Sequence, residues 1–161
     1  MTQPEIRYAH PRTLVGKKIT MSLVTDMTQV LWKSFMPERS LITNRVNAER
    51  ISLQVFPSGF FQAFDPNAEF VKWALVEVER LTDIPDGMEA FILQAGNYAV
   101  FPHKGMDKGI FQHIYADWIP NSAYSLDDRP HFEVLGEKYE NGSPESEEEI
   151  WIPITDKIIA G

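Results

Sequence analysis

The sequence predicts an α+β fold in which duplicated β-α-β-β units form one antiparallel sheet, with two helices on one face and an open groove on the other. Three observations support this prediction. Two stretches repeat apolar residues at helical spacing, several shorter stretches alternate apolar and polar residues as strands do, and the order strand, helix, strand, strand occurs twice. Each helix has to bury its apolar stripe against the sheet, so both helices are expected on the same face.

The first unit is expected over about residues 12–80. Its helix falls at 26–36, where apolar residues recur every three or four positions until Pro37 ends the pattern. Strands are expected on both sides of this helix, at residues 14–23, 50–56 and 70–78. A polar connector at 81–87, which is rich in turn-forming residues, then separates the two units.

The second unit is expected over about residues 88–155 and repeats the same order. Strand-like sequence fills 88–101 apart from a turn at 95–97, and a helix follows at 106–118 before Pro120. Two more strands complete the unit, at residues 132–134 and 149–154.

The composition limits the classes to which the protein can belong. The chain has 161 residues, 43% of them hydrophobic, which suffices for one domain over residues 1–161. It contains no cysteine, which excludes disulfides and thiolate chemistry and favours a cytoplasmic location, and no segment has the length and apolarity needed to cross a membrane. The net charge of −8, without any stripe of basic residues, argues against direct nucleic acid binding and favours a cationic ligand or a basic protein surface as partner.

No motif for a cofactor or a metal ion is found. The four histidines have no partner at metal-ligand spacing, so no metal site is expected. The glycines near Gly16 and Gly105 do not match the loops that bind phosphates or dinucleotides, and the serines lack the context of a nucleophile elbow. We therefore expect neither a cofactor nor a serine-based acyl transfer.

The segment 149–154 contains the strongest candidate for a binding site. Successive side chains of a strand point to opposite faces, so the isoleucines would build a core while Glu149 and Trp151 share the groove face. A carboxylate beside a tryptophan suits a cationic or aromatic small molecule. By alternation Glu133, which lies between two apolar residues, is expected on this groove face as well. The competing interpretation is that Glu149 belongs to a solvated acidic run.

Aromatic residues from separate elements could complete this groove. Trp73, Trp118 and Tyr124 belong to different elements that the duplicated architecture could bring close to Trp151. Aromatic walls with one or two carboxylates make a site for amphipathic cations. Trp118 stands at the end of its helix, where a place in the core or at its rim is the competing interpretation.

Four separated motifs in the second half resemble the GyrI-like family, also described as the effector-binding domain of bacterial transcription activators. The motifs are NYAVFPHKG at 97–105, YADWIPNSAY at 115–124, HFEV at 131–134 and EIWIPI at 149–154. Together they cover most of residues 88–155 in a characteristic order. The resemblance implies two pseudo-symmetric units around a central groove, in agreement with the periodicity.

The resemblance also implies a site. Members of this family bind hydrophobic, often cationic compounds in the groove, and Glu149 matches the position of their ligand carboxylate. Trp151 stands where many relatives carry tyrosine, and Tyr98 from the first motif is expected among the ligand-binding residues. Ala123 replaces a glycine that the family favours, and Leu135 replaces a common aromatic residue. These departures concern the ligand more than the fold.

Three functions are compatible with this resemblance. Most members are fused to a DNA-binding segment for which this chain has no room, so it resembles the stand-alone members. The preferred hypothesis is a stand-alone effector-binding domain for hydrophobic, cationic or aromatic molecules, read by a separately encoded regulator. The second is a hydrolase of small strained electrophiles with Glu149 as general base and Tyr98 or Tyr124 as acid. The third is an acidic inhibitor of DNA gyrase. Binding is preferred over catalysis because Trp151 replaces the tyrosine nearest to the carboxylate.

Overall fold

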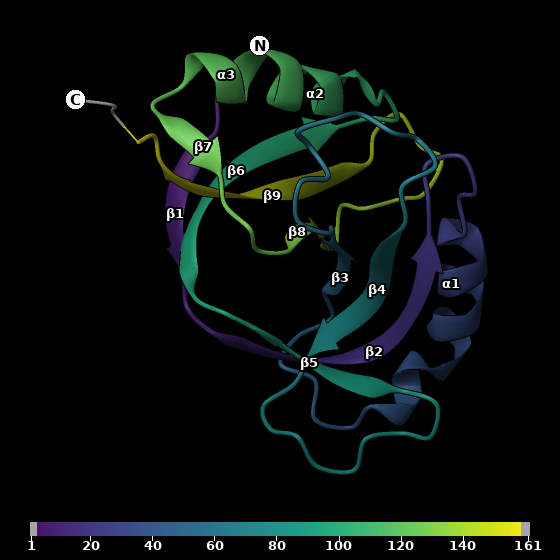
Figure 1. Ribbon diagram of the computed structural model, residues 1–161. Helices are drawn as coiled ribbons and strands as arrows, with labels where there is room; N and C mark the ends of the chain where they lie inside the picture. The colour runs from purple at the N-terminus through teal and green to yellow at the C-terminus, as the bar shows by residue number, and fades with distance from the viewer. Residues whose placement is uncertain (1–2, 159–161) are drawn as a thin grey trace.

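Nine antiparallel strands form one curled sheet in the computed structural model, which describes residues 3–158 (Figure 1). The strands are β1 (Glu5–Ala9), β2 (Arg12–Met21), β3 (Arg50–Val55), β4 (Phe70–Glu77), β5 (Glu89–Leu93), β6 (Gly96–Lys104), β7 (Tyr124–Leu126), β8 (His131–Leu135) and β9 (Glu147–Asp156). The helical elements are α1 (Thr28–Phe35), the 3-10 helix η1 (Met36–Leu41), α2 (Gly109–Gln112), the π-helical turn η2 (His113–Trp118) and α3 (Ile119–Asn121).

The sheet closes on itself because two of its end strands continue along the chain into strands at the other end, β1 into β2 and β5 into β6. The strand order is β1-β6-β9-β8-β3-β4-β2-β5, and β7 pairs with β9. At one end β1 pairs with β6, with Ala9 opposite Gly96, and at the other end β2 pairs with β5, with Arg12 opposite Leu93. Since β2 follows β1 directly in the chain and β6 follows β5, the two ends of the sheet are joined. The sheet therefore has an enclosed interior face and an outer face.

The helices cover the outer face, as the sequence predicted. Leu31 and Phe35 of α1 pack on a cluster that includes Ala74 of β4. Ile114 of η2 packs on a second cluster that includes Ile150 of β9. Figure 1 shows α1 and the α2–α3 segment outside the curled sheet. Each short helix is held by burial of its apolar stripe, because helices of this length are marginal in isolation. Within residues 3–158, no helix is long and apolar enough to span a membrane.

The sheet has the duplicated order expected of two β-α-β-β units. From the central pair of β3 and β8, the order outward is β3, β4, β2 in one half and β8, β9, β6 in the other. In that central pair Ser52 lies opposite Glu133. The α+β fold class is therefore confirmed.

Several boundaries differ from the prediction. The sequence analysis did not foresee β1 and β7, which are short strands paired on one side only. Pro37 does not end the first helical segment, because it occupies the first turn of η1, where its missing N–H costs nothing. Pro120 likewise lies in the first turn of α3. Proline marks a change in helix type here, and both helical segments end further along the chain than predicted, at residues 41 and 121.

Candidate functional site

The interior face, which was expected to be an open groove, is filled by its own side chains. Trp151 and Trp73 are only 5% and 6% exposed, and Tyr98 is fully buried in the same cluster. The Tyr98 hydroxyl donates to the backbone oxygen of Pro130 at 3.0 Å, and burial raises the pKa of this phenol to about 12. An open flat sheet would have exposed these residues, but closure of the sheet turns this face onto itself.

Glu149 and Trp151 do share a face, as predicted, but cationic side chains of the same chain already occupy it. The indole N–H of Trp151 donates to Glu149 Oε1 at 3.3 Å, and Arg7 Nη1 donates to Glu149 Oε2 at 3.5 Å. The guanidinium carbons of Arg7 and Arg12 lie 5.6 and 5.2 Å from the Trp151 ring centre, within the range of cation–π contacts. The carboxylate and the aromatic face thus already hold an internal cation.

Glu133 lies on the outer face, opposite to the face that alternation assigned to it. In the sheet register Phe132 pairs with Trp151 and Val134 pairs with Glu149, so these two apolar residues point into the interior. Glu133 pairs with Ile150 and Ser52 and points toward the helices. The prediction for Glu133 was wrong because its apolar neighbours pack inside the closed sheet and not under the helices, which reverses the face.

Glu133 belongs to a polar row that crosses the sheet beneath the helices. Gln54 of β3 pairs in register with Lys72 of β4 on one side and His131 of β8 on the other. With its amide oriented to suit its neighbours, Gln54 donates to Glu133 Oε2 and to the His131 carbonyl oxygen, both at 3.1 Å, and accepts from Lys72 Nζ at 3.1 Å. Ser52 lies directly opposite Glu133 in the sheet, and Ala74 follows on the next strand.

Burial makes the Glu133 carboxylate a proton-retaining group. It raises the pKa of Glu133 to about 7, because the charged form loses its hydration, and nearby Glu148 raises it further. Lys72, the hydrogen bond from Gln54 and Lys108 act in the opposite direction but do not cancel the effect of burial. A cation placed against Glu133 would restore its ionisation by direct pairing.

Aromatic rings form a wall beside this carboxylate. Tyr115 of η2 and His131 of β8 are joined by a hydrogen bond of 2.8 Å between the hydroxyl and Nδ1. Burial lowers the pKa of His131 to about 3, so the imidazole is neutral, and burial together with Glu133 raises the pKa of Tyr115. Phe61, from the loop between β3 and β4, stacks on both rings with centroids 4.8 and 5.1 Å apart, and Phe56 meets His131 edge-on at 5.0 Å.

Tyr115 belongs to a π-helical turn and contacts both His131 and Phe61. The helix widens into a π-helical turn over His113–Trp118, a form that recurs at functional sites because one extra residue per turn redirects side chains. A cavity of about 350 Å³ opens beside the aromatic rings, lined by residues of the 56–62 segment together with Ile119, Leu126, Asp127, Asp128, Arg129 and His131. We call Glu133, Gln54, Lys72, His131, Tyr115 and Phe61 the inter-helix site.

The predicted ligand-binding residues therefore divide into three locations. Glu149, Trp151, Trp73 and Tyr98 belong to the interior face, and Glu133 belongs to the inter-helix site. Trp118 and Tyr124 lie on the outer face but stack on each other at 6.1 Å, and Trp118 also meets Phe101 edge-on. They pack on the apolar cluster beneath α2 and α3. The structure thus does not gather the seven residues into one groove.

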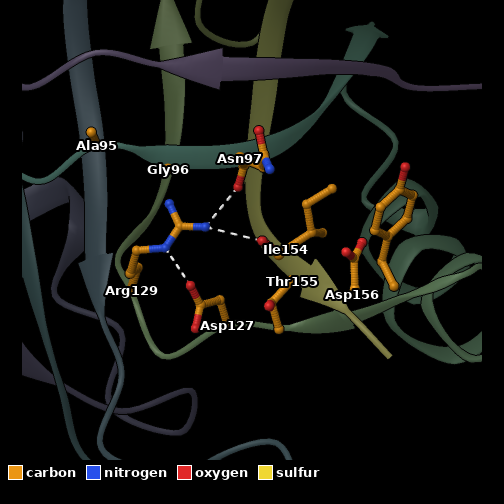
Figure 2. Close-up of a pocket in the computed structure, with 9 residues that line it drawn as sticks. Ala95, Gly96, Asn97, Asp127, Arg129, Ile154, Thr155 and Asp156 are labelled. Atoms are coloured by element: carbon orange, nitrogen blue, oxygen red, sulfur yellow. Dashed lines mark hydrogen bonds and ion pairs between the residues drawn. The ribbon is translucent and has the colours of Figure 1, made fainter. Parts of the chain in front are cut away.

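A second cavity, of about 270 Å³, lies beside the C-terminal end of β9 and shares Asp127 and Arg129 with the first (Figure 2). Figure 2 shows Arg129 at its wall, where Nε donates to Asp127 at 2.6 Å and Nη2 donates to the backbone oxygens of Asn97 and Ile154 at 2.7 and 3.1 Å. The guanidinium also lies over the Tyr98 ring, at 4.7 Å, and leaves no space for a side chain at Gly96. Arg129 thus fastens β6, β9 and the segment before β8 together.

Sequence reasoning missed most of the inter-helix site. Gln54, Lys72, His131 and Tyr115 were not proposed as site residues, although the last two lie in motifs that carried the family resemblance. One signal was present in the sequence, because Lys72 is a polar residue inside an otherwise apolar stretch of its strand, whereas Gln54 follows the ordinary alternation of its strand. Polar residues at such positions need buried partners, so they mark either a hydrogen-bonded core or a site.

The fold and the inter-helix site define a class of protein, a small α+β domain with a carboxylate and aromatic rings between two helices. The chain belongs to the family described as the GyrI-like small molecule binding domain, whose sequence model matches residues 2–155. The transcriptional regulator BrlR of Pseudomonas aeruginosa is 30% identical to it over 146 residues, which are 88% of this chain and 52% of BrlR. The chain therefore spans about half the length of that regulator.

Solved structures of low sequence identity share the fold. A structure of SAV2435 bound to tetraphenylphosphonium has a TM-score of 0.69 at 19% identity and matches 95% of this chain and 94% of its own. The C-terminal domain of EcmrR has a TM-score of 0.72 at 14% identity over 98% of this chain and 99% of its own. A hydrolase from Listeria innocua has a TM-score of 0.62 at 10% identity over 96% of this chain and 92% of its own. One fold thus carries proteins of different description, so function has to be argued from the site.

Proposed function

We propose that this chain is a receptor for an amphipathic organic cation with an aromatic body, which binds at the inter-helix site with its charge on Glu133. The observation that carries the proposal is the position of this carboxylate. It lies under the helices with a raised pKa, and the rings of Tyr115, His131 and Phe61 stand beside it. A buried carboxylate that lacks a full counter-ion favours a ligand that supplies one.

The ligand class follows from the walls of the site. Neutral His131, protonated Tyr115 and the ring of Phe56 offer flat apolar surface, which suits an aromatic or otherwise bulky hydrophobic body. A strongly hydrated small cation would lose its water without comparable compensation in such surroundings. Tetraphenylphosphonium, the ligand of SAV2435, combines four phenyl rings with one delocalised charge and meets both requirements.

The interior face is the alternative location, and its geometry is less suitable. Glu149 already pairs with Arg7, and Trp151 is covered by Arg7 and Arg12. A ligand cation would have to displace two guanidinium groups. The hydrolase hypothesis meets a related obstacle, because the Tyr98 hydroxyl donates to the Pro130 carbonyl oxygen and Tyr124 stacks on Trp118 away from Glu149. Both observations support binding over catalysis with this set of residues.

Isothermal titration with tetraphenylphosphonium separates the two locations. We expect Glu133→Gln to weaken binding by about 1 to 3 kcal/mol, roughly fivefold to 150-fold, because the amide cannot neutralise the ligand charge. Glu149→Gln is the matched control, since it removes the same charge from the other face of the sheet. Triphenylphosphine oxide, a neutral molecule of similar shape, should lose little affinity in either variant. Loss of tetraphenylphosphonium binding in Glu149→Gln alone would move the site to the interior face.

The proposed receptor is expected to act as an effector domain. The similarity to BrlR supports a link to transcription regulation, through DNA-binding sequence in the same polypeptide or through a separately encoded regulator. The net charge of −8 supports the prediction that residues 1–161 do not themselves bind nucleic acid. DNA gyrase remains the alternative protein partner, because a basic surface would attract this acidic domain. A bound ligand recovered unchanged by mass spectrometry would support a receptor, whereas Glu149-dependent addition of water would support the hydrolase.

A further inference from the structure

Lys72 stands in the inter-helix site and has no ion-pair partner within residues 3–158. The lysines that form ion pairs within residues 3–158 are Lys17, Lys18, Lys104 and Lys138. Lys72 instead donates to the Gln54 amide oxygen at 3.1 Å, and the same amide donates to Glu133 at 3.1 Å. One amide group therefore separates an ammonium from a carboxylate on the floor of the site. Asp26 lies close enough to feel the charge of Lys72, but its Oδ1 accepts the backbone N–H of Thr28 at 2.9 Å.

Gln54 fixes this arrangement and prevents the two charges from neutralising each other directly. It is buried, and its three hydrogen bonds hold the amide with the oxygen toward Lys72 and the nitrogen toward Glu133. An ammonium has three N–H donors, and the amide oxygen takes only one of them. The side chain of Lys72 is only partly buried, so the remaining donors can reach a ligand. The site thus presents a negative end and a positive end a few ångströms apart.

We propose that Lys72 determines the specificity of the inter-helix site, so that the site selects aromatic cations that also carry a carboxylate or a comparable anionic group. This inference rests on the proposed function, because it assumes that Glu133 receives the positive charge of the ligand. A simple monocation gains the Glu133 contact but also meets the repulsion of Lys72. A zwitterion with correct spacing pairs with both groups and leaves neither charge uncompensated.

A matched pair of dyes tests this inference. Rhodamine B is a zwitterion at neutral pH, and its ethyl ester differs only in lacking the carboxylate. Fluorescence titration should show that Lys72→Met weakens binding of rhodamine B by about tenfold, the usual effect of one charge-assisted contact, while binding of the ester is unchanged or tighter. Lys138→Met is the control, because it makes the same change of net charge at a side chain that is 79% exposed. Lys72→Arg should retain the preference for rhodamine B.

The possible outcomes separate this inference from the proposed function. If Glu133→Gln weakens both dyes but Lys72→Met affects them equally, the site binds cations and the role of Lys72 is refuted. If the wild-type protein binds neither dye nor tetraphenylphosphonium, the proposed function fails and this inference fails with it. A preference for the ester in the wild-type protein would also refute it. Thermal melts of each variant show whether a loss of binding reflects a loss of fold.

Discussion

Glu133 should make the stability of the fold depend on pH in a direction unusual for a carboxylate. Its pKa is raised from the ordinary value of about 4.3 to about 7 in the folded chain, so the folded state holds a proton that the unfolded state releases. Its contribution is therefore fully present below about pH 4 and is lost as the pH rises through 7. The loss amounts to about 3 to 4 kcal/mol, since each unit of pKa corresponds to about 1.4 kcal/mol.

Urea denaturation at pH 5 and pH 8 checks this prediction. Glu133→Gln removes the titration, so we expect its free energy of unfolding, relative to wild type, to increase between pH 5 and pH 8. The comparison between the two proteins is needed because His131, whose pKa is lowered to about 3, destabilises the fold as the pH falls below 6.5. That contribution is common to both proteins. A difference that stays constant over this pH range would contradict the raised pKa of Glu133.

The face assigned to a single side chain depends on which side of the strand is taken as the core. Glu133 alternates with two apolar neighbours, and that pattern is compatible with burial of either face. Glu149 and Trp151 lie on the same face as predicted, because they are two residues apart on one strand. Glu133 was predicted on the wrong face. Alternation within one strand shows which of its residues share a face, but it does not show which face of a neighbouring strand they join.

The loop between β3 and β4 covers part of the inter-helix site with the ring of Phe61. Phe56, Phe60, Phe61 and Phe70 pack together, and Phe61 alone stacks on both Tyr115 and His131. The ring of Phe61 is 40% exposed, so it gains less from burial than its neighbours and can be displaced at lower cost. An aromatic ligand that competes for the same surface has to move this ring.

We expect Phe61→Ala to bind tetraphenylphosphonium about three to ten times more tightly than wild type, because the site no longer has to open before binding. Stopped-flow fluorescence should show the change mainly in the association rate. Phe64→Ala is a suitable control, since that side chain is 81% exposed and removes the same apolar volume from the same loop. Weaker binding in Phe61→Ala would instead identify Phe61 as a wall that the ligand uses.

Closure of the sheet depends on a close approach of backbones at Gly16. This residue lies in β2 opposite Leu75 of β4 and opposite Glu89 of β5. A Cβ atom at this position would stand 1.8 Å from the backbone oxygen of Ala74, a distance that no rotamer change can relieve. Gly16→Ala must therefore move β2 away from β4. Because β2 follows β1 directly in the chain, this movement would also disturb the closure of the sheet.

Gly16→Ala should lower the free energy of unfolding by about 3 kcal/mol or more, which differential scanning calorimetry would record as a large fall in Tm. Gly136→Ala provides the comparison, because the nearest atom to its new Cβ would be Glu49 Oε2 at an ordinary contact distance of 3.6 Å. That variant is expected to remain within about 0.5 kcal/mol of wild type. Similar stability of the two variants would show that the sheet tolerates separation at β2.

Local pattern in the sequence determined the elements of this protein and their order. Helical and strand periodicities located α1, the 109–121 helical segment and seven of the strands, and the requirement to bury two apolar stripes placed both helices on one face. The motifs of the second half pointed to the family that the comparisons confirm. These features depend on residues that are neighbours along the chain, so they can be read without knowledge of the fold.

Only the tertiary structure decided which face of the sheet holds the candidate site. Pairing of β1 with β6 and of β2 with β5 closes the sheet, buries Trp151 and Trp73, and brings Arg7 onto Glu149. The same closure leaves Glu133 under the helices, next to Gln54 from a strand about eighty positions earlier in the chain. Such contacts arise from the register and curvature of the whole sheet, and no local pattern of residues specifies either.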